Sequence, residues 1–470
     1  MKEFYKQNDI ERLIFEYKVM SQKGTVGFYE KAVFLDMISY LEKHQESELA
    51  ILACEDAFSQ HVYSYEFLIR KSQLLLSLDV PNEAVECLEE ALKFSPSDME
   101  IKMALIEAYI QAGRETDADQ FIDEMIEEAR GENAKAKIYL LQAEILEHQG
   151  DFEKMFFALK KALESGVVED VNALLNKIWF AVEMSGLHEE SIEFHTSYID
   201  ESPYSFLAWF NLGQAYFCLE KYEEAAEAFE YVNIIKKDFE LGYKDGAEAF
   251  LMLRNYEKAL ECLTEYMDIA DPDSEVYTKL GICHEHLNDI ETAKIFYEKA
   301  IFLNPCNSLA LFRLGECSVV MEDWDTAISY YNQAIEMDCG KEEYLAALAE
   351  AYFKNKNIQQ AREFFQRATE MAPELSQYWA KYALFLMAMG DGEEAASILD
   401  EARIHAGGTE LLYCKVACLF AMSKRDEAFK TLLEALEENV SLLESLFTFS
   451  PDLEKDSEVR QLVEAYRPKI

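Results

Sequence analysis

Proline, glycine and long apolar runs are scarce in this chain, and each scarcity excludes a class of structure. Only 8 of its 470 residues are proline and 17 are glycine, which suits helices joined by short turns and argues against long flexible linkers. No segment approaches the roughly 18 uninterrupted apolar residues that a membrane-spanning helix needs. Residues 1–9 are polar and charged, so we expect no secretory signal there.

Basic residues are also few. The chain carries 90 Asp and Glu against 44 Lys and Arg, which gives a formal net charge of -46. Such a surface repels phosphate backbones and anionic lipid headgroups, so we expect neither nucleic acid nor a membrane as a partner. A basic partner would be attracted, more strongly at low salt. The alternative is that the acidity only keeps a long helical surface soluble.

Motifs for catalysis and cofactor binding are missing. We find no phosphate loop G-x-x-x-x-G-K-[ST], no dinucleotide fingerprint G-x-G-x-x-G after a strand and no H-E-x-x-H zinc helix. Cys414 and Cys418 share a helix face, but a metal needs about four ligands and no second cysteine pair lies nearby. His284 and His286, two residues apart, face away from each other on a helix. We therefore predict a non-catalytic protein without a metal or a cofactor.

The 10 cysteines are scattered and fall mostly in helical patterns. Cys54 and Cys262 stand at packing positions, where a reduced cysteine acts as a small core residue. This usage predicts reduced thiols and a cytoplasmic location.

The most informative feature that is present is an alanine that recurs every thirty-four residues. A fixed period of this length is typical of a helical solenoid, in which each unit packs only on its neighbours. The series is interrupted at Met155 and Ser191, where two steps are longer and we expect longer turns. Its members are Ala50, Ala84, Ala118, Ala225, Ala259, Ala293, Ala327, Ala361, Ala395 and, one residue early, Ala428.

Each repeat has the pattern of two helices, most clearly between Ser274 and Asn307. By their three- and four-residue spacing, one face of the first helix carries Tyr277, Leu280 and Gly281. One face of the second carries Ala293, Tyr297 and Ala300. Pro305 closes the unit, since the chain cannot stay helical there. Small residues are expected where adjacent helices approach closely, because a bulky side chain would push them apart.

These residues resemble the tetratricopeptide repeat family, whose pattern is W/L-x-x-L-G-x-x-Y in the first helix, then A-x-x-x-F-x-x-A and a closing proline. The unit that begins at Phe206 matches it with Trp209, Leu212, Gly213, Tyr216, Ala225 and Phe229. The resemblance implies a free-standing, all-α, right-handed superhelical solenoid of about twelve units. We expect an N-terminal capping segment at 1–30, the repeats at 31–440 and C-terminal capping helices at 441–470.

In this family the first helices line the concave side, and certain positions of each unit tend to face the ligand. Carried over to this chain, the resemblance implies a groove wall that combines carboxylates with exposed aromatic side chains. The candidate groove residues are Glu107, Glu144, Phe210, Phe217, Lys244, Glu248, Phe312, Glu316, Glu350 and Phe353. A clamp for an acidic peptide tail is not expected, because no Lys and Asn pair stands at the positions that such a clamp uses.

The predicted function is a non-catalytic scaffold that binds a protein or peptide segment with basic and apolar side chains. Carboxylates would pair with Lys or Arg, and aromatic faces would hold apolar groups or stack on guanidinium. Two alternatives stay open. The glutamates can be ordinary solvated residues, or the chain can be a structural protein that self-associates through its ends or its convex face. The residues do not specify the partner.

Overall fold

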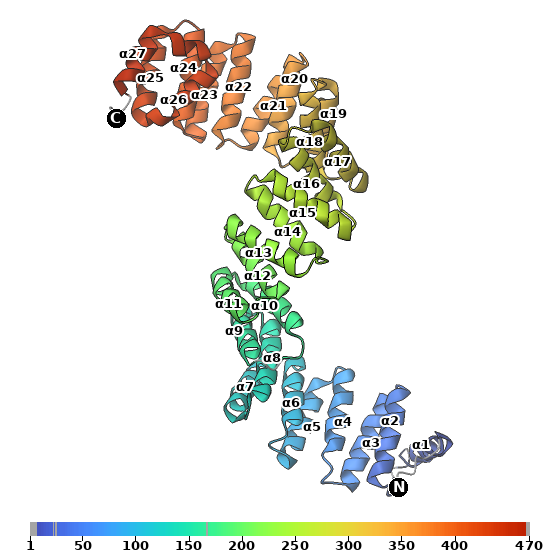
Figure 1. The fold of residues 1–470 in the computed structure, drawn as a ribbon. Helices are drawn as coiled ribbons and strands as arrows, with labels where there is room; N and C mark the ends of the chain where they lie inside the picture. Colours follow the sequence, from blue (N-terminus) through green and yellow to red (C-terminus); the bar gives the residue numbers. More distant parts are fainter. Residues whose placement is uncertain (1–6, 22, 24–25, 166–167, 467–470) are drawn as a thin grey trace. The chain divides into compact units, whose positions relative to one another are not determined.

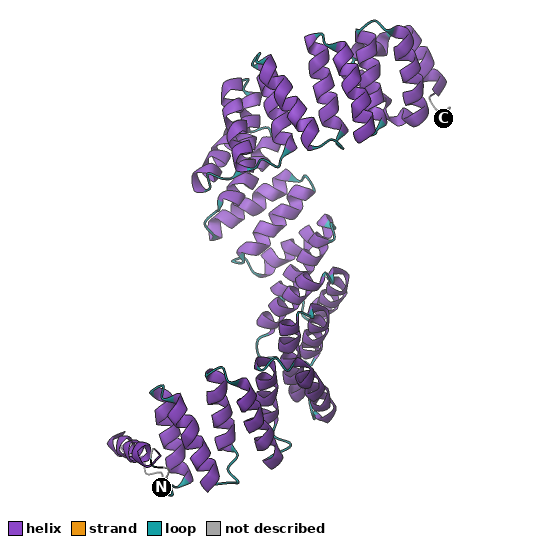
Figure 2. Cartoon of the chain, turned by 180° about the vertical axis from the view of Figure 1, so that it is seen from behind, coloured by secondary structure: helices purple, strands orange, loops and turns teal. Residues whose placement is uncertain are grey.

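The computed structural model describes residues 7–21, 23, 26–165 and 168–466. Within these ranges every regular element is helical and no strand occurs (Figure 2). The chain divides into two compact units, Met1–Ile235 and Lys236–Ile470, and each is described by itself. The predicted all-α solenoid of paired helices is confirmed.

Consecutive helices stand side by side within each unit (Figure 1). The described helices of the first unit are α1 (Gln7–Ser21), α2 (Lys31–Lys43), α3 (Ser47–Gln60), α4 (Glu66–Ser77), α5 (Pro81–Phe94), α6 (Met99–Gln111), α7 (Glu115–Glu128), α8 (Glu132–Gln149), α9 (Phe152–Glu164), α10 (Val171–Ser185), α11 (His188–Glu201), α12 (Phe206–Cys218) and α13 (Tyr222–Ile235). The even-numbered members from α2 to α12 are the first helices of their pairs, and the odd-numbered members from α3 to α13 are the second helices.

The second unit continues the same alternation from α14 to α25 and then ends in shorter elements. Its described helices are α14 (Glu240–Met252), α15 (Tyr256–Ile269), α16 (Ser274–His286), α17 (Ile290–Leu303), α18 (Ser308–Val320), α19 (Trp324–Met337), α20 (Glu342–Lys354), α21 (Ile358–Met371), α22 (Ser376–Met389), α23 (Gly392–His405), α24 (Thr409–Ala421), α25 (Arg425–Asn439), η1 (Val440–Leu442), α26 (Leu443–Phe449), η2 (Pro451–Lys455) and α27 (Ser457–Tyr466).

The recurring alanines are core residues of the second helices. Every alanine of the series is 0% exposed. A methyl group lets the two helices approach closely, whereas a larger side chain at this position requires the neighbouring helices to adjust. The thirty-four-residue period therefore records helix packing rather than surface chemistry.

Volume is matched between the two helices of a pair at a second position. Gly281 of α16 faces the ring of Tyr297 in α17, and Gly315 of α18 faces Tyr331 in α19. A Cβ added to either glycine would overlap the ring. One repeat before Gly281 the same two positions hold alanine and leucine, Ala247 and Leu263, both 0% exposed. Glycine thus accompanies a tyrosine ring in these two pairs, and alanine accompanies leucine one repeat earlier.

The irregular stretch between Ala118 and Ser191 corrects one expectation in part. The first longer step does not lengthen a turn: α8 has 18 residues where α6 has 13, so the extra residues extend a helix. The second longer step does fall in a connection, between α9 and α10. Residues 166–167 of that connection lie outside the described part of the chain.

Both ends carry helices that pack on the neighbouring pair. In α1, Ile14 and Tyr17 are buried against α2, and the Tyr17 hydroxyl donates a hydrogen bond to Asp56 Oδ2 at 2.6 Å. At the other end Val459 and Val463 of α27 are buried in the core that α25 shares. Capping by 1–30 and 441–470 stays a prediction, and residues 1–6, 22, 24–25 and 467–470 of these segments lie outside the described residues.

Candidate functional site

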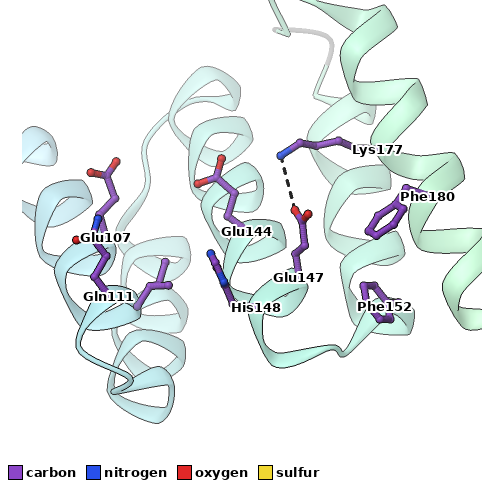
Figure 3. A pocket seen from close by; sticks show the side chains of 9 residues that line it. Glu107, Gln111, Glu144, Glu147, His148, Phe152, Lys177 and Phe180 are labelled. Atoms are coloured by element: carbon purple, nitrogen blue, oxygen red, sulfur yellow. Dashed lines mark ion pairs between the residues drawn. The ribbon is translucent and has the colours of Figure 1, made fainter. Parts of the chain in front are cut away.

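A hollow in the first unit brings two of the predicted groove residues together. It has a volume of about 690 Å³ and lies over the first helices α6, α8 and α10 (Figure 3). We call it the α6–α10 hollow. Its lining consists of Glu107, Ile110 and Gln111 from α6, Glu144, Glu147 and His148 from α8, Phe152 at the start of α9, and Lys177 and Phe180 from α10.

Two carboxylates on one side of the hollow have no internal partner. Glu107 and Glu144 make no hydrogen bond or ion pair with any described residue. Glu107 is exposed as a whole residue, yet partial desolvation of its carboxyl raises its pKa, and the negative charge of Glu144 raises that pKa further. Two like charges therefore face the hollow without compensation, which makes it a region of negative potential.

The opposite side of the hollow is aromatic and carries one cation. The rings of Phe152 and Phe180 meet edge to face, with 5.6 Å between centroids, and Phe180 is 39% exposed. Lys177 Nζ lies 3.9 Å from Glu147 Oε2, the ion pair drawn in Figure 3. Sequence reasoning did not include these four residues among the site candidates. Phe180 stands at the same repeat position as Glu144, so its repeat position could have identified it as a residue of the predicted groove.

Two predicted carboxylates of the second unit are already neutralised by lysines of the next repeat. Glu248 of α14 pairs with Lys279 of α16. Glu350 of α20 pairs with Lys381 of α22, with 2.6 Å between Oε1 and Nζ. Neither carboxylate offers an uncompensated charge to a guest, so a guest cation would have to displace a lysine.

Lys244, the predicted basic residue of the groove, is also occupied. Its ammonium lies 3.1 Å from Asp273 Oδ2 and 3.3 Å from Glu275 Oε2. These two carboxylates and their hydrogen bonds raise the pKa of Lys244 against the opposing effect of burial, which is the largest single influence. Lys244 is therefore part of a network between α14 and α16 rather than an isolated cation.

Glu316 has a different environment from the other predicted carboxylates. The hydroxyl of the buried Tyr331 donates a hydrogen bond to it. Burial raises the pKa of Glu316 above the ordinary range, although the Tyr331 hydroxyl partly offsets this effect. Glu316, Phe312 and Glu350 line a smaller hollow of about 200 Å³. The structure thus brings these three predicted residues together within the second unit.

The expectation of exposed aromatic side chains on the predicted wall is wrong. Phe210 and Phe312 are 8% and 3% exposed, because each ring packs on rings of neighbouring helices, and Phe312 also stacks on Tyr344 of the next pair at 4.6 Å. Phe312, for example, lies 5.4 Å from the Tyr331 ring. Phe217 and Phe353 are partly buried and contact Tyr222 and Phe385, with centroids 5.3 Å and 5.2 Å apart.

The sulfur and imidazole groups singled out in the sequence have structural surroundings. Cys414 and Cys418 are 0% exposed in the core around α22 and α24, as predicted for packing residues. His284 Nδ1 lies 3.3 Å from Asp289, whereas the ring of His286 stacks on another side chain, Tyr256, at 4.1 Å. Among the described residues, no group of three or more His, Cys, Asp or Glu side chains is placed to hold a metal ion.

No described helix combines the length and the apolar character that crossing a bilayer requires.

Comparison with known families gives one consistent match. Sequence profiles described as tetratricopeptide repeat match residues 75–145, 136–165, 206–233, 274–305 and 319–385. The matches fall in both units. They include the helices that line the α6–α10 hollow up to the end of α9.

Two mammalian proteins are similar in sequence. The BBSome complex member BBS4 of Bos taurus is 23% identical over 343 residues, which covers 65% of this chain and 64% of that protein. BBS4 of Mus musculus is 30% identical over 112 residues, 24% of this chain and 21% of that protein. The chain thus spans less than two thirds of the length of either relative.

Solved structures show weak overall similarity. The APC/C hetero-tetramer Cut9-Hcn1 aligns with a TM-score of 0.42 and 16% identity, covering 85% of this chain and 83% of that chain. YrrB, described as a TPR protein with an unusual peptide-binding site, aligns with a TM-score of 0.34 and 17% identity, covering 39% and 95%. The C-terminal part of a TPR protein from Cytophaga hutchinsonii aligns with a TM-score of 0.41 and 15% identity, covering 54% and 98%.

Proposed function

Since the chain belongs to the tetratricopeptide repeat family of protein-interaction scaffolds, we propose that its first unit binds a partner segment with basic and apolar side chains in the α6–α10 hollow. The protein acts as a non-catalytic adaptor. The observation that carries this proposal is the pair Glu107 and Glu144, two carboxylates that face one hollow without a cation of their own.

The lining of the hollow fits a guest with two kinds of side chain. A Lys or Arg of the guest compensates Glu107 and Glu144 and removes the repulsion that raises the Glu107 pKa. Its aliphatic stem, or an apolar neighbour, packs on the exposed edge of Phe180 beside Phe152. The net charge of -46 attracts such a segment from a distance.

The second unit contributes less to this binding. Glu248 and Glu350 attract a guest only after Lys279 or Lys381 has moved away, and Glu316 is held by Tyr331. Phe210, Phe217, Phe312 and Phe353 support the helices that present the site, because their rings lie largely between helices. Lys244 keeps its network intact.

Further elements of the proposal concern the ends of the chain and its location. The N-terminal segment 1–30 and the C-terminal helices of 441–470 cover the terminal pairs, as the buried faces of α1 and α27 support. Nucleic acid and membranes are not partners, and the protein works in the cytoplasm without a cofactor or a metal.

The likeness to BBS4, a member of the BBSome complex, supports a place in an assembly of several proteins. Because the match covers only 64% of the bovine protein, the identity of that assembly is a separate question. The lining of the hollow favours a partner subunit that presents a segment with basic and apolar side chains.

The test is a binding titration of the full chain. A fluorescent peptide that alternates arginine and leucine is compared with one in which glutamate replaces arginine. The double variant Glu107→Gln, Glu144→Gln should bind the arginine peptide about ten-fold more weakly or worse, since each lost charge contact is worth roughly 1 kcal/mol.

The matched control is the double variant Glu127→Gln, Glu164→Gln, which makes the same change of charge on the second helices α7 and α9. Its affinity should stay within about two-fold of the wild type, because distant charges are screened at physiological salt. Equal losses in both double variants would mean that general acidity, and not this hollow, attracts the peptide.

The second candidate function is structural self-association. It is favoured by apolar side chains at the N-terminal end, since Phe15 and Phe28 are 68% and 74% exposed. Light scattering over a range of concentrations separates the two functions. A mass that stays that of one chain supports the adaptor, and a mass that grows with concentration supports assembly.

A further inference from the structure

Lys177 is the one cation among the residues that line the α6–α10 hollow. It projects from α10, and its side chain is 48% exposed. Lys177 and Glu144 also border a neighbouring hollow of about 480 Å³ between α8 and α10. Lys177 thus stands where a guest that enters either hollow would meet it.

The ion pair that holds Lys177 is loose. Its Nζ is 3.9 Å from Glu147 Oε2, well beyond the roughly 2.7–2.9 Å of a charge-assisted hydrogen bond. By contrast, the second-unit pair of Glu350 and Lys381 closes to 2.6 Å. The Glu147 side chain is 42% exposed, so water screens the attraction and little is lost when the pair opens.

A positive charge in this position acts on a basic guest in two ways. It repels the guest cation that approaches Glu107 and Glu144, and it competes with that cation for Glu147. A guest with a single basic residue gains the two unpaired carboxylates but meets this repulsion. A guest with two adjacent basic residues can engage Glu147 as well and push the Lys177 ammonium out into water.

We propose that Lys177 is a built-in competitor which makes the hollow select segments with clustered basic residues over segments with one. This inference rests on the proposed function, because it concerns the specificity of the same hollow. Lys177 is a specificity-determining residue here, and Glu107 and Glu144 remain the attracting groups.

The experiment titrates the full chain with two fluorescent leucine-rich peptides, one with a single arginine and one with two adjacent arginines. The wild type, Lys177→Met, Lys177→Arg and Lys161→Met are compared at low and physiological salt. Lys161→Met is the matched control, because it removes the same charge from α9, nine residues or roughly 13 Å along the helix from Phe152. Thermal unfolding confirms that each variant is folded.

Lys177→Met should bind the singly basic peptide roughly two- to five-fold more tightly than the wild type, and the preference for the doubly basic peptide should shrink. Lys177→Arg keeps the charge and should behave as the wild type, and Lys161→Met should change neither affinity by more than about two-fold. A purely structural role of Lys177 would not change the ratio of the two affinities.

The inference is overturned if the wild type binds both peptides while Lys177→Met binds the singly basic one equally well or more weakly. Loss of binding in the Glu107→Gln, Glu144→Gln variant together with that result would leave the proposed function standing and remove only the role of Lys177. If the wild type binds neither peptide even at low salt, the proposed function fails and the inference fails with it.

Discussion

The substitution Gly281→Ala tests the packing that defines each helix pair. The added methyl group would overlap the Tyr297 ring, including Cδ1 and Cζ at 2.6 and 2.8 Å. Tyr297 is 0% exposed, and its hydroxyl donates a hydrogen bond to Glu285 Oε2 at 2.6 Å, so the ring has no room to swing away. Overpacking of this kind costs about 1–3 kcal/mol, and the fixed ring places the expected cost near 3 kcal/mol.

The preceding repeat supplies the compensating change. Ala247 and Leu263 stand at the equivalent positions and are both fully buried, so this pair combines alanine with a side chain smaller than tyrosine. Tyr297→Leu alone leaves a cavity and should cost about 2–4 kcal/mol. In the double variant the new methyl group occupies part of that cavity. The two substitutions together should therefore cost at least about 1 kcal/mol less than the sum of the single changes.

The assay is hydrogen exchange of the backbone amides of α16 and α17, which reports the opening free energy of this pair alone. Gly340→Ala is the control, because its added Cβ would meet only Asp338 Oδ1 at 3.4 Å in an exposed turn. It should change the opening free energy by less than about 0.5 kcal/mol. Equal costs of Gly281→Ala and Gly340→Ala, or strict additivity in the double variant, would refute the volume-matching argument.

Burial lowers the pKa of His195 from 6.5 to about 4, so the unfolded state takes up a proton that the folded state rejects. The opening free energy of α10 to α12 is therefore highest above about pH 6.5, and it falls by roughly 3 kcal/mol in all as the pH drops toward 4. His195→Gln should remove this part of the pH dependence, as measured by hydrogen exchange. Glu322 has a φ of 57°, a left-handed conformation that glycine adopts with less strain. Glu322→Gly should therefore raise the unfolding free energy by roughly 0.5–1 kcal/mol in urea titrations, and a loss of stability would show that the backbone is not strained there. Lys279→Met should lower the stability of the second unit by roughly 1–3 kcal/mol, because Glu248 loses its cation while Glu275 keeps only Lys244. An unchanged melting temperature would show that this network contributes nothing.

The sequence predicts the helix pairs well because packing repeats with the chain. Each alanine of the series must fit a contact between adjacent helices, and Gly281 must leave room for the Tyr297 ring. The residue type at these positions is therefore fixed by packing between neighbouring helices, and it recurs with the repeat. The turn positions are less readable. Gly150 and Gly186 adopt a positive φ there, but so do Arg254 and Lys356, whose residue types give no signal.

The charge state of the predicted wall depends on the next repeat, and this part was missed. Glu248 and Glu350 each have a lysine thirty-one residues further along the chain, and those lysines neutralise them. The repeats that follow Glu107 and Glu144 are longer, so the repeat position of those lysines is held there by Leu141 and Lys177, and Lys177 pairs with Glu147. The repeat register predicts no lysine partner for Glu107, but it does not predict that Lys177 pairs with Glu147 rather than with Glu144.

The buried aromatic residues could not be placed from the repeat position alone. Phe210 and Phe312 stand at positions that the resemblance assigns to the ligand, yet their side chains point between helices. Burial of a large apolar side chain lowers the free energy of the folded chain whether or not a ligand is bound. Phe210 packs beside Phe229, and Phe312 packs beside Tyr331. The repeat position fixes the place of the Cα atom, but the packing of neighbouring helices determines the direction of the side chain.

The most direct measurement is photo-crosslinking of a basic, leucine-containing peptide to the full chain, with the attachment sites identified by mass spectrometry. The account predicts that crosslinks concentrate on the first helices of the first unit, at residues around the hollow such as Gln111, His148 and Phe180. They should disappear when unlabelled peptide competes. Crosslinks concentrated on the second helices α7, α9 and α11, or spread evenly over both units, would contradict it.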